Sequence, residues 1–183
     1  IIITIFFSAI STISAEEIKR IFIGNKDAKI TIIAFESLTC SHCANFHKDV
    51  FPELKKEYLD TGLAKIEFRH FPLDIAAFNA SKVSQCNNDG DSNILNSLFA
   101  NQQKWVKGNS IEEANKNLQK FLVNEGYDLD FEKCINDKEI EDFVLNDRIE
   151  GAKKFKINAT PTIIINNEKF EKSLNYKNLK KAL

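Results

Sequence analysis

The fold of this chain is decided where it reads FESLTCSHCANFH, at Phe35–His47. The run before it, Ile30–Phe35, is mostly apolar and rich in β-branched residues, which predicts a buried strand. A helix is predicted after it, because apolar residues recur there at helical spacing: Cys43, Phe46, Val50, Leu54 and Tyr58. The pattern therefore predicts a strand-to-helix junction, with Cys40 at the mouth of the helix and Cys43 one turn inside.

The place of Cys40 predicts its chemistry. The free N–H groups and the positive dipole end of a helix stabilise an anion, and the anion of cysteine is the thiolate that attacks disulfides. We therefore expect Cys40 to be the reactive thiol and the deeper Cys43 to be the resolving thiol. His42, between them, is expected to donate a hydrogen bond or positive charge toward the Cys40 thiolate, although an exposed loop histidine fits the sequence as well.

A CxxC pair at such a junction is either a redox pair or half of a zinc site. Zinc needs four ligands, usually from a second CxxC or a spaced histidine pair. The remaining cysteines, Cys86 and Cys134, are isolated, and His42, His47 and His70 form no such pair. The sequence therefore favours redox chemistry, with no metal and no other cofactor, and His47 and His70 are expected to be packing or surface residues.

Four separated motifs occur in the order in which one known family carries them. They read IGNKDAKITII at Ile23–Ile33, SLTCSHC at Ser37–Cys43, RHFPLD at Arg69–Asp74 and ATPT at Ala159–Thr162. Through them, residues 21–183 resemble the DsbA-type thiol:disulfide oxidoreductases of the thioredoxin superfamily. The resemblance implies an α/β protein with a thioredoxin fold and an inserted all-helical subdomain.

Two positions depart from the family pattern. Ser41 stands where a proline more often precedes the histidine, and Ala34 stands where relatives often carry a buried glutamate. Glu36 lies two residues after Ala34 and therefore on the same face of the predicted strand. We expect Glu36 to serve as the substitute proton acceptor.

The resemblance also assigns a role to the ATPT motif. The bond between Thr160 and Pro161 resembles the cis-proline that faces the active-site cysteines in this family. Its use would be to turn the backbone so that Thr160 can pair with an extended substrate strand beside Cys40. We therefore expect Thr160 and Pro161 to bind substrate.

Amino-acid composition and the spacing of apolar residues divide the chain into four segments. Residues 1–15 carry no charge, and their mostly apolar first half is followed by small residues. This pattern indicates the remnant of a secretory signal peptide. The segment is shorter than the roughly 20 residues that span a bilayer. A buried N-terminal strand and a retained membrane anchor are the alternatives. Residues 16–73 and 156–183 are expected to form the thioredoxin domain. The helical period of residues 74–155 predicts the insertion.

Local signals place further elements. A second strand over Leu63–Phe71 completes a βαβ unit, since parallel strands need a crossover. Other signals predict a helix kink at Pro52, a capping box of Ser110 and Glu113 on a helix stopped by Gly126, and a hairpin of Thr162–Ile165 and Glu168–Phe170 around Asn166–Asn167.

Cys86 and Cys134 lie 48 positions apart within the predicted insertion. Two cysteines in one subdomain of an exported protein seldom stay reduced, and relatives with a similar insertion often carry a second pair. We therefore expect a structural disulfide between them, with buried free cysteines as the alternative.

Composition excludes one class of function. The 183 residues are 43% apolar and carry a formal net charge of −1, with no concentrated basic stripe, so no nucleic-acid partner is expected. We expect a periplasmic monomer that introduces disulfides into exported, folding proteins with free thiols and is reoxidised by a DsbB-like membrane partner. The alternatives are a reductase or isomerase, or a chaperone-type or metal-binding module with an inert CxxC.

Overall fold

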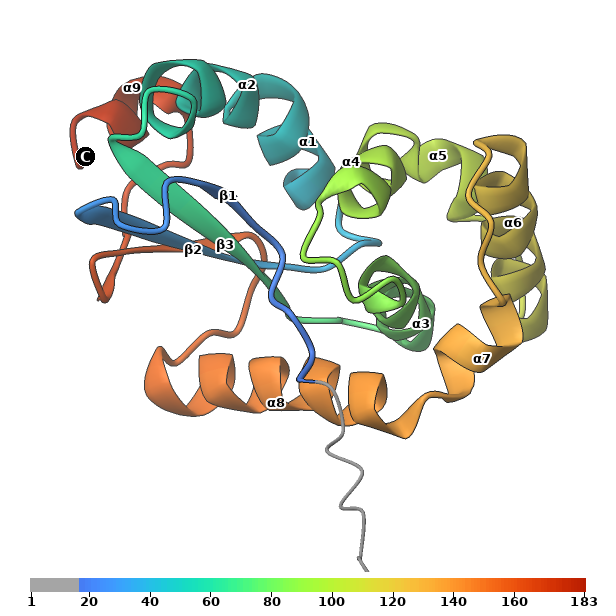
Figure 1. Cartoon of the computed structure of the whole chain (residues 1–183). Coiled ribbons are helices and arrows are strands. Elements are labelled where there is room, and N and C mark those ends of the chain that lie inside the picture. The colour runs from blue at the N-terminus through green and yellow to red at the C-terminus, as the bar shows by residue number, and fades with distance from the viewer. Residues whose placement is uncertain (1–16) are drawn as a thin grey trace, which may run out of the picture.

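The computed structural model describes residues 17–183, so the expected signal remnant at 1–15 lies outside the described residues. Within that range the chain forms a five-stranded sheet in the order β1-β3-β2-β4-β5 (Figure 1). Strands β2 and β3 pair in parallel, and the other neighbours pair antiparallel. The strands are β1 (Phe22–Gly24), β2 (Ile30–Glu36), β3 (Ala64–His70), β4 (Thr162–Ile165) and β5 (Glu168–Lys169).

The parallel pair is joined by the helical run that begins at the CxxC motif, as the βαβ pattern predicted. The run comprises α1 (Ser41–Asp49), α2 (Phe51–Leu54) and a π-helical turn, η1 (Lys55–Leu59). The kink predicted at Pro52 is a full break in the structure, since α1 ends at Asp49 and Pro52 lies in the first turn of a separate helix, α2. A proline is tolerated there because its missing N–H would have no helical partner.

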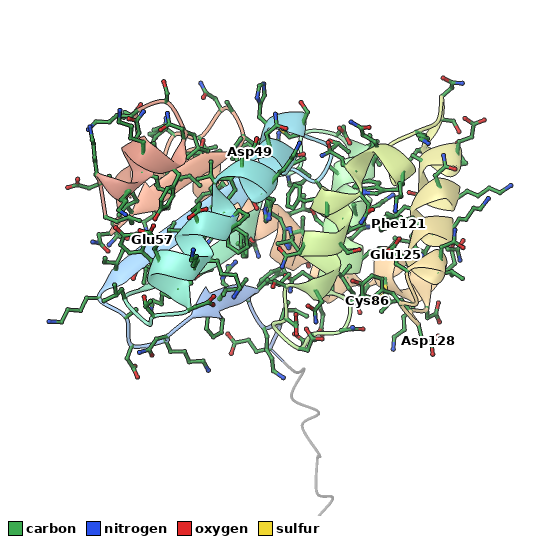
Figure 2. The ribbon with its side chains drawn as sticks, turned by 90° about the horizontal axis from the view of Figure 1, so that it is seen from above. Asp49, Glu57, Cys86, Phe121, Glu125 and Asp128 are labelled. Carbon is green, nitrogen blue, oxygen red and sulfur yellow. A yellow bond between two sulfur atoms is a disulfide. The ribbon has the colours of Figure 1, made fainter. Side chains whose placement is uncertain are left out.

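The chain between β3 and β4 forms the predicted helical block. Figure 2, seen from above, shows this block beside the CxxC run: Asp49 and Glu57 mark that run, while Phe121 and Glu125 mark the block. None of the helices within 17–183 is long and apolar enough to cross a membrane. The helices are α3 (Ile75–Gln85), α4 (Asn93–Ala100), α5 (Gln102–Trp105), α6 (Ile111–Asn124), α7 (Phe131–Asn136) and α8 (Lys138–Lys154).

The start of α6 follows the predicted capping signal in part. Ser110 Oγ accepts a hydrogen bond from the Glu113 N–H at 3.2 Å, which satisfies one free donor of the first turn. The reciprocal bond of a full capping box is shifted by one residue, because the Glu113 carboxylate accepts from the N–H of Asn109 at 2.8 Å. The helix ends at Asn124, shortly before Gly126, whose φ is +83°.

Helix α8 covers the face of the sheet opposite to α1 (Figure 1). A small second core lies there, formed by Ile33, Phe35, Phe71, Ile157 and Ile164. Gly151 permits the close approach of α8, since a β-carbon at this position would lie 2.9 Å from Cε1 of Phe35. Because α8 contacts both β3 and α3, it joins the sheet to the helical block, and the domain boundary at residue 155 stays a prediction.

The C-terminal hairpin is confirmed. Asn166 and Asn167 connect β4 to β5 with φ values of 48° and 71°, the positive angles that a tight hairpin turn requires. A short helix, α9 (Tyr176–Lys180), follows the hairpin. Strand β1 was not predicted, because its three residues are too few to show a period, and its antiparallel pairing with β3 is long-range.

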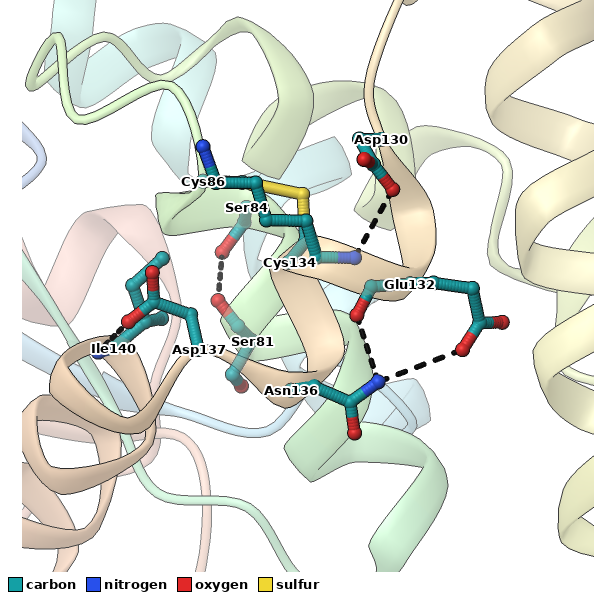
Figure 3. The surroundings of a disulfide bond; sticks show 10 residues. Ser81, Ser84, Cys86, Asp130, Glu132, Cys134, Asn136, Asp137 and Ile140 are labelled. Carbon is teal, nitrogen blue, oxygen red and sulfur yellow. Dashed lines mark hydrogen bonds between the residues drawn. A yellow bond between two sulfur atoms is a disulfide. The ribbon is translucent and has the colours of Figure 1, made fainter.

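The structure joins Cys86 and Cys134 in a disulfide with Cα atoms 5.4 Å apart (Figure 3). Cys86 follows the last turn of α3, and Cys134 lies in α7, where its N–H donates to the carbonyl of Asp130 at 2.9 Å. The bond therefore links two helices of the block that are separated in the chain by α4, α5 and α6.

Candidate active site

Cys40 occupies the N-cap position of α1, directly after the loop that follows β2. Its carbonyl accepts the N–H groups of Cys43 and Ala44 at 3.1 and 3.2 Å, which start the helix. The pKa of the Cys40 thiol is lowered to about 5, chiefly by a hydrogen bond from the Cys43 thiol and further by the backbone N–H groups of Cys43 and His42. Cys40 is therefore a thiolate at neutral pH, the state that its position predicted.

Cys43 has the opposite character. Its side chain is fully buried, and burial is the main reason that the pKa of its thiol is raised above the ordinary value. The hydrogen bond to Cys40 and the charge of Glu36 raise that pKa further. The two free cysteines thus form one nucleophilic thiolate and one protonated thiol that donates to it.

The loop before β4 faces the reactive cysteine. The Sγ atom of Cys40 lies 3.4 Å from the carbonyl oxygen of Thr160, to which it donates when it is protonated, and the bond between Thr160 and Pro161 is cis. Sequence reasoning placed these two residues beside Cys40 only through the family resemblance. The structure brings them together with the CxxC pair.

A groove of about 520 Å³ lies between α1, this loop and residues 174–176. His42 lines it with an exposed side chain, and the part of His42 that lowers the pKa of Cys40 is its backbone N–H. The other lining residues are Asn45, Phe46, Asp49, Val50, Thr160, Pro161, Leu174, Asn175 and Tyr176. The groove thus places apolar and hydrogen-bonding groups beside Cys40, as an extended peptide would need.

Glu36, at the end of β2, is buried and interacts with the thiols of Cys40 and Cys43. Burial raises the pKa of its carboxyl, and His47 opposes that rise. The Nε2 atom of His47 lies 2.9 and 3.1 Å from the two carboxylate oxygens. Sequence reasoning missed this pair, although the spacing of four between Cys43 and His47 already placed both on one face of the helix.

His70 is buried elsewhere, where its Nε2 lies 3.1 Å from Oε1 of Gln85, and burial lowers its pKa. This environment fits the packing role expected from the sequence. Among residues 17–183, no three histidine, cysteine, aspartate or glutamate side chains gather as a metal site would require.

Gln102 is a further residue that sequence reasoning missed. From the first turn of α5, its Nε2 donates to the carbonyls of Leu38 at 2.8 Å and Cys40 at 3.1 Å. A side chain of the helical block thereby holds the loop that presents the reactive cysteine. No local pattern could reveal a contact between residues 62 positions apart.

The fold and the site together can be compared with known proteins. A family model described as "Thioredoxin" matches residues 16–183. The chain belongs to the thioredoxin family. Within this family it is similar to the crystal structure of Wolbachia pipientis alpha-DsbA1, with 31% identity and a TM-score of 0.78 over 89% of this chain and 88% of that one. The predicted fold class and the predicted DsbA-type resemblance are thereby confirmed.

Curated relatives of this thioredoxin-family chain are named for disulfide chemistry. Disulfide bond formation protein D of Bacillus subtilis is 26% identical over 171 residues, which cover 88% of this chain and 74% of that protein. A Rickettsia bellii protein, provisionally named as a protein-disulfide oxidoreductase, is 30% identical over 148 residues, or 79% of this chain and 56% of that protein. The matched regions span 56% and 59% of the Rickettsia bellii and Rickettsia prowazekii relatives.

Proposed function

We propose that this chain catalyses thiol:disulfide exchange and introduces disulfide bonds into folding, exported proteins through Cys40 and Cys43. The observation that carries the proposal is the opposite shift of the two thiol pKa values within the CxxC pair. The pKa of Cys40 is lowered to about 5 and that of the buried Cys43 is raised, so one sulfur attacks and leaves readily while the other stays protonated. The names of the relatives support the same chemistry.

The exchange runs in two steps from the oxidised form. A substrate thiolate attacks Sγ of Cys40, which breaks the Cys40–Cys43 bond; Cys43 leaves and takes up a proton, and a mixed disulfide forms. A second substrate thiolate then attacks the substrate sulfur of that mixed disulfide, and Cys40 leaves as a thiolate. The substrate gains a disulfide, and the CxxC pair is left reduced. Thr160 and Pro161 are proposed to hold the substrate strand, and Glu36 to exchange the proton of Cys43.

The direction follows from the stability of the Cys40 thiolate. A low pKa favours the reduced pair, so the disulfide form oxidises other thiols. Equilibration of the pair against glutathione, followed by quantifying both forms, tests this. A reduction potential well above the thioredoxin value of about −270 mV supports an oxidase, and one near that value supports the reductase or isomerase alternative.

A chaperone-type or metal-binding module is the alternative from another class, in which the CxxC is inert. Titration of the reduced protein with a thiol reagent, alongside zinc analysis, separates the two. One rapidly reacting thiol, that of Cys40, and one slowly reacting thiol, that of Cys43, without zinc support the oxidoreductase. One zinc ion per chain with unreactive thiols would contradict it.

The cellular setting is part of the proposal. We propose that the protein is a periplasmic monomer, because disulfides persist in exported compartments. There it acts on exported proteins with free thiols and is reoxidised by a DsbB-like membrane partner. Brief reduction of intact cells, followed by labelling with a thiol reagent that cannot cross the inner membrane, tests the location. Modification of Cys40 in such cells supports export, and protection until lysis contradicts it.

A further inference from the structure

Glu36, at the end of β2, and His47, one turn after Cys43 in α1, form a buried pair. Their side chains are 4% and 7% exposed, and His47 Nε2 lies within hydrogen-bond distance of both Glu36 oxygens, at 2.9 and 3.1 Å. When Glu36 is a carboxylate, both of its oxygens are acceptors and Nε2 carries the proton. Such a pair can hold one proton between the two groups, as carboxylate and imidazolium or as carboxyl and imidazole, with no net charge in the core.

The His47 ring is fixed by aromatic neighbours from three elements. It stacks on Phe99 of α4 with ring centroids 4.1 Å apart and an interplanar angle of 18°, and on Phe68 of β3 at 5.4 Å and 29°. Phe51 of α2 lies 5.4 Å away on a tilted plane. These contacts hold the plane of the imidazole and so keep Nε2 directed at Glu36.

His47 also connects this pair to the surface. It lines a groove of about 740 Å³ between α1 and the α4–α5 segment, a different groove from the one beside Thr160. Cys43, in contrast, is fully buried, yet the Glu36 charge acts on its thiol. The pair therefore lies between a buried thiol that must gain and lose a proton and a groove open to solvent.

The charged and titratable surroundings of the pair are few. Cys40 and Cys43 on α1 are the thiols that interact with the Glu36 carboxylate. Lys48 of α1 and Lys104 of α5 line the groove together with His47.

We propose that His47 is a positioning residue that relays the proton of Cys43, through Glu36, between the buried thiol and the groove between α1 and the α4–α5 segment. The inference rests on the exchange function proposed above. When Cys43 leaves as a thiolate, the pair gives it the shared proton through the Glu36 carboxyl, which leaves a carboxylate beside a neutral imidazole, and solvent in the groove then returns one proton to His47. During reoxidation the same transfers run in reverse, and Cys43 attacks as its proton passes to Glu36.

The test follows the step that needs the Cys43 proton removed. Reduced protein is mixed rapidly with oxidised glutathione, and the mixed disulfide on Cys40 and its resolution by Cys43 are followed by acid quench and mass spectrometry between pH 5 and 8. His47→Phe keeps a ring among the phenylalanines without a donor, and His47→Gln keeps a donor for Glu36 but does not titrate. Both variants are expected to slow resolution by at least about tenfold and to change its pH profile.

Two comparisons separate proton relay from structural damage. Alkylation of Cys40 by iodoacetamide should stay within about twofold of wild type in both variants, because the N-cap geometry of Cys40 is untouched. The double variant Glu36→Gln with His47→Gln should resolve the mixed disulfide no more slowly than Glu36→Gln alone. Both substitutions interrupt the same proton path, so the second has nothing further to remove. Lys104→Gln, a charge change in the same groove, should resolve at the wild-type rate.

The outcomes distinguish this inference from the proposed function. Wild-type protein that never forms or resolves the mixed disulfide overturns the exchange function itself. Wild-type exchange with an unchanged rate and pH profile in His47→Gln overturns the relay and leaves the exchange function standing. If His47→Phe does not fold, the His47→Gln profile alone decides.

Discussion

Sγ of Cys40 lies 3.4 Å from the carbonyl oxygen of Thr160, a residue 120 positions later in the chain. This contact joins the first βαβ unit to the loop before the C-terminal hairpin. It places the attacking sulfur beside a backbone segment that borders a groove of about 520 Å³. An extended peptide that pairs with this segment would bring its own sulfur within reach of Cys40.

The first prediction concerns the charge of Cys40. Its pKa is lowered to about 5 from the ordinary 9.0, so the thiolate is present above pH 5 and is lost below it. Thiolate absorbance near 240 nm and the rate of Cys40 alkylation should therefore both titrate with a midpoint near pH 5. Cys43→Ala should raise this midpoint, because the largest cause of the shift is the Cys43 hydrogen bond. A wild-type midpoint near 9 would contradict the site geometry.

The same shift predicts how the stability of the reduced protein depends on pH. A pKa that is lower in the folded than in the unfolded chain adds stability above the unfolded value, and this contribution declines as pH falls toward the folded pKa. Between pH 9 and pH 5 the reduced form should therefore lose stability relative to the oxidised form, which has no Cys40 thiolate. Urea unfolding of both forms across that range measures the difference, and parallel curves would contradict the prediction.

Substitution of each cysteine tests the division of roles. Cys40→Ser should abolish exchange, because it removes the attacking sulfur, whereas Cys43→Ser should accumulate mixed disulfides on Cys40, because it removes the resolving one. Non-reducing electrophoresis and mass spectrometry of reduced protein incubated with a disulfide-containing peptide distinguish the two. Equal loss of exchange, with no trapped adduct in Cys43→Ser, would count against the assignment.

The parts of the fold that sequence predicted depend on local signals. The CxxC junction follows from a change of period at Cys40, and the hairpin follows from Asn166–Asn167, whose side chains tolerate positive φ. The Glu36–His47 pair could not be predicted in the same way. The helical period shows which face His47 shares with Cys43, but only the packing of α1 on β2 shows what lies opposite that face.

The disulfide between Cys86 and Cys134 is predicted to stabilise the helical block. Closing a loop of 48 positions should contribute about 4 kcal/mol in the chain-entropy model. Replacing both cysteines by alanine should therefore lower the unfolding free energy by a few kcal/mol while Cys40 keeps its alkylation rate, since the bond lies outside the CxxC loop. Denaturant unfolding measures the loss. A double variant as stable as wild type would show that the native bond contributes nothing.

Gly151→Ala sets two effects of similar size against each other. Alanine is about 1 kcal/mol more favourable than glycine inside a helix. Its β-carbon, however, would lie 2.9 Å from Cε1 of Phe35 and 3.2 Å from Cδ2 of Phe71, and overpacking of a filled core costs about 1–3 kcal/mol. We expect a net loss of stability in denaturant unfolding, whereas Lys153→Ala, exposed on the same helix, should be nearly neutral. A variant more stable than wild type would show that α8 can move outward at no cost.

Gln102 is predicted to couple the helical block to the reactive loop. Its amide nitrogen donates to the carbonyls of Leu38 and Cys40, and loss of such bonds costs about 0.5–1.5 kcal/mol each. Gln102→Ala should lower the unfolding free energy by about 1–3 kcal/mol and should also change the alkylation rate of Cys40, because the N-cap carbonyl loses its outer partner. The matched control is Gln103→Ala, an exposed neighbour that lines the same groove, which should change neither quantity. If Gln102→Ala is destabilised while Cys40 reacts as in wild type, the contact holds the helical block in place without affecting the thiol.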